Sequence, residues 1–215
     1  MVTKKEVIHI IIAIVIFTLI LSFNNNFFSY AKIPAYLLMS LTIILVSVFA
    51  KKITASKLDI KIEHEVWKWS RYWITKKSYL PFSVPIGFFL PALIGFLTAG
   101  SVKFLTFLQF ESEALPSKAS KAYGRRRFST VMEWDDAMIG FYGLISVLLL
   151  AVIAKLFVSP NPSILYEFSK YALYFGAYNL IPFSKLDGMR IFMGSRPLYV
   201  FSLVLAALTA LVIFF

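Results

Sequence analysis

Several apolar runs of about 20 residues restrict the fold of this chain more than any other feature. A helix needs roughly this many apolar residues to cross the hydrocarbon core of a bilayer. Hydrophobic residues make up 59% of the 215 residues and charged residues only 15%, a balance unusual for a soluble domain. The sequence therefore predicts an α-helical, polytopic integral membrane protein with one compact membrane domain over residues 1–215.

Five of these runs are predicted to be transmembrane segments. The first follows Lys4 and Lys5 and is long and uniformly apolar, so we interpret it as a retained anchor rather than a signal peptide. The chain contains no cysteine, which excludes disulfide bonds and thiolate metal sites. In chain order the predicted spans are 7–23, 33–50, 137–158, 164–181 and 197–215.

A sixth apolar run, residues 84–105, is either a sixth span or a re-entrant segment. Basic residues cluster on both sides of it, in 51–81 and 103–135. Lys and Arg near span ends favour the cytoplasmic side, and both clusters lie there only if the run enters the membrane and returns. A break around Pro91 and Gly95 would allow this, with the non-helical backbone buried against other helices. The alternative is a plain sixth span with one basic loop outside.

The same charge rule predicts the orientation. If 84–105 returns, then the N-terminus, the loop around Asp187 and nearly all of the 22 basic residues lie in the cytoplasm. We expect the membrane to be the plasma membrane of a prokaryote. Anionic lipid head groups then account for the net charge of +11, so the lipid bilayer is an expected partner and nucleic acid is not.

Between the spans the pattern changes from helical to extended. Apolar and polar residues alternate from Leu58 to Val66, the period of a half-buried strand. Further strands are predicted over 102–110 and 128–134, so that 57–81 and 102–135 hold a small antiparallel β element on the cytoplasmic side. A helix over 58–73 is the competing interpretation, because apolar residues recur there at helical spacing as well.

Histidine content restricts any metal chemistry, since the chain has only two histidines, His9 and His64. A zinc hydrolase needs about three protein ligands and a general base, and a His-Glu-x-x-His helix places two ligands and the base together. His64 and Glu65 match the first two positions of this motif. Lys68 stands at the second ligand position, and a protonated ammonium has no lone pair to donate. His64 is therefore either an ordinary sheet residue or one remaining metal contact.

The segment from Asn179 to Gly188 is the most specific candidate site. Pro182 is expected to end the preceding span, and Leu186 to anchor the loop. Asp187 then presents a carboxylate at the membrane boundary, and Gly188 lets the chain turn closely beside it. A carboxylate at such a depth costs free energy and is by default a functional-site hypothesis. The alternative is structural, with Asp187 capping the next turn or pairing with a nearby basic residue.

The pattern Asn-x-x-Pro-x-x-x-Leu-Asp-Gly at 179–188 resembles the C-terminal motif of the site-2 intramembrane zinc metalloproteases, particularly the small prokaryotic and archaeal forms. In that family the Asp is the third zinc ligand, and the resemblance assigns this position to Asp187. The order of elements from about residue 33 to the C-terminus is also similar: a catalytic helix, cytoplasmic strands, an apolar segment, more strands, a glycine-containing span and the Leu-Asp-Gly span. Outside residues 179–188 few residues are identical to the family's pattern.

Two placements of the family's catalytic helix remain open. In the first, the inner end of the second span aligns with the His-Glu-x-x-His motif, so that Ser47, Val48 and Lys51 replace both ligands and the base. In the second, His64 and Glu65 keep one ligand and the base. On either placement the set of three zinc ligands is incomplete.

The resemblance and the incomplete ligand set together imply a non-catalytic, site-2-protease-like membrane protein that binds or regulates membrane-embedded polypeptides, without a cofactor. One alternative is an active intramembrane zinc metalloprotease with His64, Asp187 and a non-standard third ligand, and with Glu65 as base. Another is a small transporter or channel component. The ionisable residues near span ends, His9, Glu167 and Lys170, would support it, although Glu167 and Lys170 are three residues apart and are expected to pair with each other.

Overall fold

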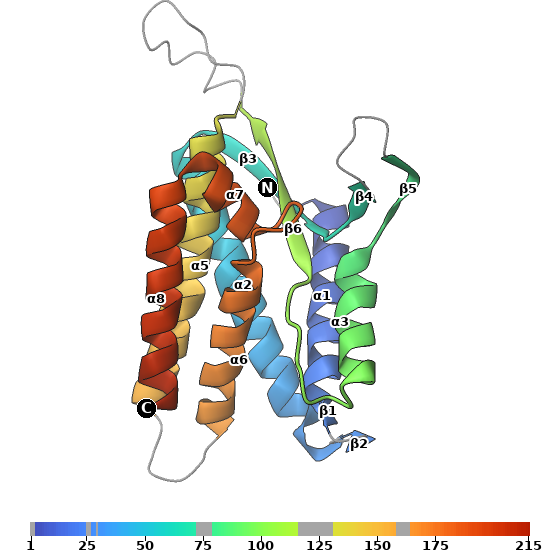
Figure 1. The fold of residues 1–215 in the computed structure, drawn as a ribbon. Helices are drawn as coiled ribbons and strands as arrows, with labels where there is room; N and C mark the ends of the chain where they lie inside the picture. The colour runs from blue at the N-terminus through green and yellow to red at the C-terminus, as the bar shows by residue number, and fades with distance from the viewer. Residues whose placement is uncertain (1–2, 25–26, 29, 72–78, 116–130, 158–163) are drawn as a thin grey trace, which may run out of the picture.

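The computed structural model describes the chain except for residues 1–2, 25–26, 29, 72–78, 116–130 and 158–163. In chain order its elements are α1 (Lys4–Ser22), β1 (Phe23–Asn24), β2 (Phe27–Phe28), a 3₁₀ helix (Tyr30–Lys32), α2 (Ile33–Lys57), β3 (Ile60–Val66), β4 (Trp69–Arg71), β5 (Tyr79–Val84), α3 (Ile86–Leu97), β6 (Leu108–Ala114), α5 (Glu133–Leu156), α6 (Ile164–Asn179), α7 (Asp187–Gly194) and α8 (Arg196–Phe214). The helices lie side by side. We call the end that holds β3, β6 and α7 the sheet end, and the opposite end, where the C-terminus lies, the far end (Figure 1).

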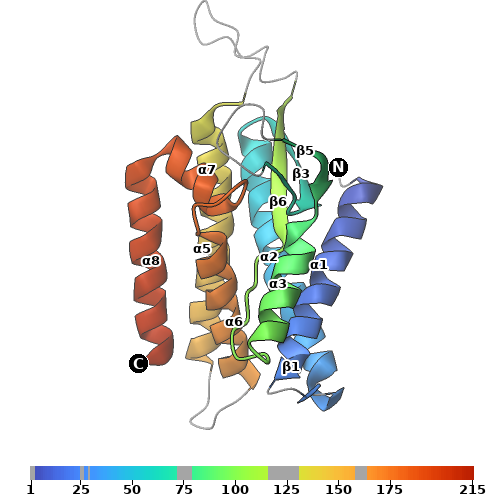
Figure 2. The ribbon, with the colours of Figure 1, turned by 45° about the vertical axis from the view of Figure 1, so that its right-hand side comes forward.

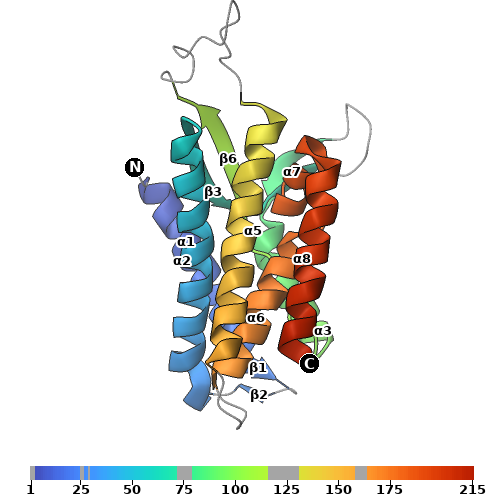
Figure 3. The same ribbon diagram turned by 90° about the vertical axis from the view of Figure 1, so that its left-hand side faces the viewer.

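The bundle is organised around α5, which packs against α2, α6, α7 and α8. Figure 3 shows α5 between α2 and α8. Among the described residues, four helical segments are long and apolar enough to cross a membrane: α1, residues 30–57, α5 and α8. These match four of the predicted spans. The fifth prediction, 164–181, is a helix of only 16 residues that stops at Asn179, shortly before Pro182, which has no N–H to continue the helix.

The apolar run 84–105 enters the bundle and returns. Helix α3 begins at the sheet end, and the chain that follows it leads back to β6 at the same end (Figures 1 and 2). The predicted break around Pro91 and Gly95 is wrong, because α3 continues through both residues. The turn lies at Ala99 and Gly100, with φ of 51° and 79°, and the Gly100 N–H donates to Gly95 O at 2.7 Å. Both residues are in the left-handed conformation, which ends the helix and which glycine adopts without strain.

The strand predicted over Leu58–Val66 is confirmed as β3, and the competing helix over 58–73 is wrong for that segment. β3 pairs antiparallel with β6, from Ile60 opposite Ala114 to Val66 opposite Leu108. The Trp67 N–H extends the ladder by donating to Phe107 O at 2.8 Å. The strand predicted over 102–110 is shifted, since β6 begins only at Leu108.

The third predicted strand, 128–134, is wrong where the structure describes it. Residues 128–130 lie outside the described residues, and α5 already begins at Glu133. Its first turn holds Glu133, Asp135 and Asp136, and negative charges stabilise a helix N-terminus. The Met132 N–H also donates to Asp135 Oδ2 at 3.4 Å. Helix-end electrostatics therefore outweigh the apolar pattern at this position.

The N-terminal end of α1, the paired strands β3 and β6, and the start of α7 at Asp187 all lie at the sheet end (Figures 1 and 2). The start of α1 and the Asp187 loop thus lie at one end of the bundle, and that they share one side of a membrane stays a prediction. The assignment of that side to the cytoplasm stays a prediction from charge.

Candidate functional site

A buried ion pair between α2 and α7 forms the centre of the candidate site. Asp187 is the first residue of α7, and Lys51 lies in the last two turns of α2. Lys51 Nζ is 2.6 Å from Asp187 Oδ2, and each side chain is only 5% exposed. Asp187 Oδ1 is also buried and has no hydrogen-bond partner among the described residues. Asp187 therefore pairs with a residue distant in sequence, and not with Lys185 or Arg190 beside it.

Gly143 of α5 makes room for this pair, and Gly140 of the same helix lies beside it. A Cβ at Gly143 would lie 2.7 Å from Lys51 Cγ, so the lysine stem fits only because position 143 has no side chain. A Cβ at Gly140, one turn earlier on the same face, would lie 3.6 Å from Asp187 Cβ. On its other side, Lys51 Nζ lies 5.5 Å from the ring centroid of Phe110, which is within cation–π range.

The face of α2 that carries Lys51 is buried and includes Ser47 and Val48. Ser47 and Lys51 are one helical turn apart, so their side chains share this face. The residues of the first motif placement therefore lie on the buried side of α2 from which Lys51 reaches Asp187. Their correspondence to a former zinc site stays a prediction.

The motif segment 179–188 brings α7 close to the end of α6. Leu186, Asp187 and Gly188 are buried, whereas Pro182 is exposed in the connecting loop. A Cβ at Gly188 would overlap the carbonyl group of Leu180 and lie 2.9 Å from Ile181 O. The glycine is thus required by a close backbone approach, as the sequence predicts. Asn179 is also buried, but its Nδ2 donates to Phe175 O at 2.8 Å within α6.

His64 lies in a second buried polar group next to the first. Its Nδ1 is 2.9 Å from Glu6 Oε1, and its backbone N–H donates to the same oxygen at 3.2 Å. Burial lowers the pKa of His64, the hydrogen bond to Glu6 raises it, and the charge of Lys51 lowers it further. Because the net direction is downward, the neutral ring donates from Nδ1 to the carboxylate. Nε2, which is also buried, then carries a lone pair and has no partner among the described residues.

Sequence reasoning missed Glu6, which holds this second group together. Its side chain is almost fully buried in the first turn of α1, and its Oε2 lies 2.7 Å from Lys52 Nζ. A carboxylate in such a place requires a partner, and it has both His64 and Lys52. The sequence signal that could have identified Glu6 is its position as a single acidic residue at the start of an apolar run.

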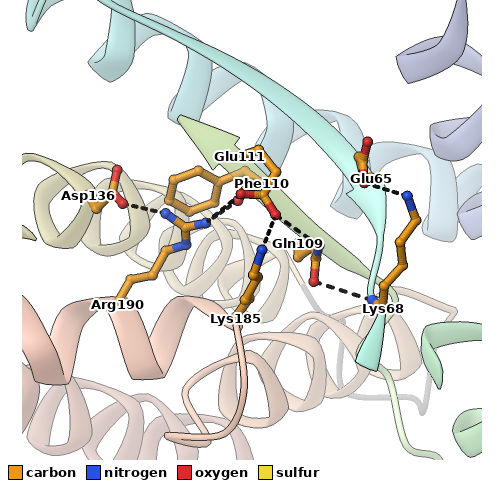
Figure 4. Close-up of polar contacts among 8 residues, drawn as sticks. All are labelled: Glu65, Lys68, Gln109, Phe110, Glu111, Asp136, Lys185 and Arg190. Atoms are coloured by element: carbon orange, nitrogen blue, oxygen red, sulfur yellow. Dashed lines mark hydrogen bonds and ion pairs between the residues drawn. The ribbon is translucent and has the colours of Figure 1, made fainter. Parts of the chain in front are cut away.

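Glu65 is not part of the buried site. Successive side chains of a strand point to opposite faces, and Glu65 is half-exposed on the face away from His64. Glu65 Oε2 lies 2.6 Å from Lys68 Nζ, whose hydrogen bond lowers the pKa of the carboxyl group (Figure 4). The second motif placement needs a helix with both residues near one metal, so the strand contradicts it.

A polar network at the sheet end fixes α7 against β6 (Figure 4). The Arg190 guanidinium pairs with Asp136, donates to Phe110 O and stacks over the Phe110 ring with its Cζ 4.0 Å from the centroid. Lys185 Nζ lies 2.7 Å from Glu111 Oε1. These contacts position the helix that begins with Asp187. They join residues far apart in sequence, so no local pattern indicates them.

The residues of this site do not fit a zinc ion. Within the described parts of the chain no three His, Asp or Glu side chains are grouped as metal ligands. More directly, the ammonium of Lys51 already supplies the positive charge beside Asp187, and it would repel a second cation.

No known protein family, curated protein or solved structure matches this chain. The resemblance to the site-2 proteases thus stays a prediction carried by residues 179–188 and by the inner end of α2.

Proposed function

We propose that this chain is a non-catalytic, site-2-protease-like integral membrane protein that binds membrane-embedded polypeptides. One observation carries the proposal: the Lys51 ammonium lies 2.6 Å from the carboxylate that the family motif would give to zinc. Lysine at this position removes a ligand and also neutralises Asp187. A carboxylate paired in this way no longer attracts a metal.

An apolar cleft between α1 and α3 supports the binding part of the proposal. Its volume is about 330 Å³, and Gly95 leaves open space at its surface, since a Cβ there would meet no atom within 4 Å. A cleft of this kind at membrane depth suits an apolar segment of another polypeptide. The lining residues are Ile16, Leu19, Ile20, Phe23, Phe88, Ala92, Gly95 and Phe96.

The sheet edges are less suitable for binding a client strand. At the middle of β3 the His64 N–H is already bonded to Glu6, and at the middle of β6 the Phe110 carbonyl accepts from Arg190. Strand addition needs free backbone groups along an edge. The α1–α3 cleft is therefore the site we assign to the client.

A binding and cleavage assay tests this proposal. The protein is placed in nanodiscs with a fluorescent peptide that contains a single apolar span, and binding and peptide mass are followed together. We expect saturable binding without cleavage. A Gly95→Trp variant fills the cleft and is expected to weaken binding at least about tenfold, because the cleft supplies the apolar contact area.

The matched control is Ala207→Trp, which adds the same side chain to an exposed position on α8. It should leave binding unchanged. Peptide cleavage that requires Asp187 would contradict the non-catalytic proposal. Equal binding by wild type and by the Gly95→Trp variant would contradict the assigned cleft.

A further inference from the structure

Two lysines at the far end of the bundle share one aromatic ring. Lys155 of α5 has its Nζ 4.9 Å from the ring centroid of Tyr166, and Lys170 of α6 has its Nζ 4.3 Å from the same centroid. Lys170 Nζ also lies 5.9 Å from the ring centroid of Phe214 in α8. Both ammonium groups therefore lie within cation–π range of one ring, where α5, α6 and α8 meet.

These ammonium groups have no acidic partner within the described residues. Lys170 was expected to pair with Glu167, but Glu167 Oε1 lies 3.0 Å from Lys32 Nζ and its other oxygen accepts from the Tyr36 hydroxyl. Lys155 donates one hydrogen bond, to Ile213 O at 2.7 Å. Most of the N–H donors of the two lysines are thus left for a ligand, and an anion placed between them would relieve the repulsion of like charges.

Their position in the fold indicates where the anion comes from. The ends of α5 and α8 lie together at the far end (Figure 1), and phospholipid phosphates lie at the ends of membrane-spanning helices. Leu156 and Phe157, which follow Lys155, are largely exposed. A ligand here therefore meets cations and apolar side chains together, the combination that a phospholipid offers and that a free phosphate does not.

We propose that Lys155 and Lys170 bind the phosphate of an anionic phospholipid, with Tyr166 and Phe214 beside its glycerol and acyl groups. The proposal depends on membrane insertion, and it is independent of the client-binding function and of the α1–α3 cleft. The lipid would lie in the leaflet opposite to the sheet end. There it would link α5, α6 and α8, which are separate in sequence.

Native mass spectrometry of the delipidated full chain tests this site. Phosphatidylglycerol, phosphatidylcholine and inorganic phosphate are titrated separately, and the tightest binding constant is measured for each. We expect Lys170→Gln to weaken phosphatidylglycerol binding about fivefold and Lys155→Gln/Lys170→Gln to weaken it about 25-fold, since each lysine near a membrane surface contributes roughly one such factor. Binding of phosphatidylcholine should not change.

A Lys4→Gln/Lys57→Gln variant removes two exposed charges at the sheet end and is the matched control for net charge. It should keep the tight phosphatidylglycerol constant, as should Lys155→Arg/Lys170→Arg. The single Lys170→Gln variant leaves the Lys155–Ile213 bond in place, so weaker binding with an unchanged Tm reports the site rather than the fold. Equal weakening in the sheet-end control, no weakening in the double variant, or equally tight binding of inorganic phosphate would each overturn the proposal.

Discussion

Replacing Lys51 with methionine is expected to lower the free energy of unfolding by about 3–5 kcal/mol, because it leaves the Asp187 carboxylate buried without a counter-charge. Asp187→Leu should cost a similar amount by leaving the ammonium unpaired. The double variant Lys51→Met/Asp187→Leu is expected to recover most of the loss, since two apolar side chains of similar size need no charge compensation. Unfolding in mixed micelles, followed by far-UV circular dichroism, measures all three.

The exposed Lys68–Glu65 pair offers a control with the same chemistry. Its side chains are 35% and 33% exposed, against 5% for each member of the buried pair. Lys68→Met should therefore change stability by no more than about 1 kcal/mol. If the two single substitutions at Lys51 and Asp187 simply add in the double variant, the buried pair does not stabilise the fold in the way described.

Adding one methyl group at Gly188 is expected to be nearly as damaging. In Gly188→Ala the new Cβ overlaps the carbonyl group of Leu180, which is backbone and cannot rotate away as a side chain can. Either α7 moves away from the end of α6 or the loop between them deforms, and we expect a loss of at least about 3 kcal/mol, the upper range for overpacking. Thermal unfolding of the purified variant measures the loss.

Gly95→Ala is the matched control, because a Cβ at that position has open space around it. Inside α3, alanine also favours the helix over glycine, so its stability should stay equal or rise by up to about 1 kcal/mol. A wild-type Tm for Gly188→Ala would show that the close approach of α6 and α7 is not required.

Local patterns predicted much of the fold. Apolar and polar residues alternate from Leu58 to Val66. In a strand this alternation turns the apolar side chains to one face, which is buried in the structure. The long apolar runs also predicted the long helices, because a helix needs about 20 apolar residues to cross a bilayer. The close approach at Gly188 could also be predicted, since Leu-Asp-Gly places the glycine directly after a buried residue.

Contacts between distant residues were not predictable in this way. Two adjacent lysines suggested that the second span ends at residue 50, yet α2 continues to Lys57. Lys51 forms an ion pair with Asp187, and Lys52 forms one with Glu6. The helix can continue because the charge of each lysine is compensated by a carboxylate from another element. Similarly, Glu167 pairs with Lys32 rather than with its neighbour on α6. Such partners are set by tertiary packing and leave no periodic signal.

The zinc content of a restored variant tests the central claim most directly. Ser47→His, Val48→Glu and Lys51→His together return two ligands and a base to the buried face of α2, where Asp187 supplies the third ligand. Elemental analysis of the purified chain should find stoichiometric zinc in this variant, and the zinc should be lost when Asp187→Asn is added. The wild-type chain should hold none. Stoichiometric zinc in the wild type, or none in the restored variant, would contradict the view that Lys51 has taken the place of a metal beside Asp187.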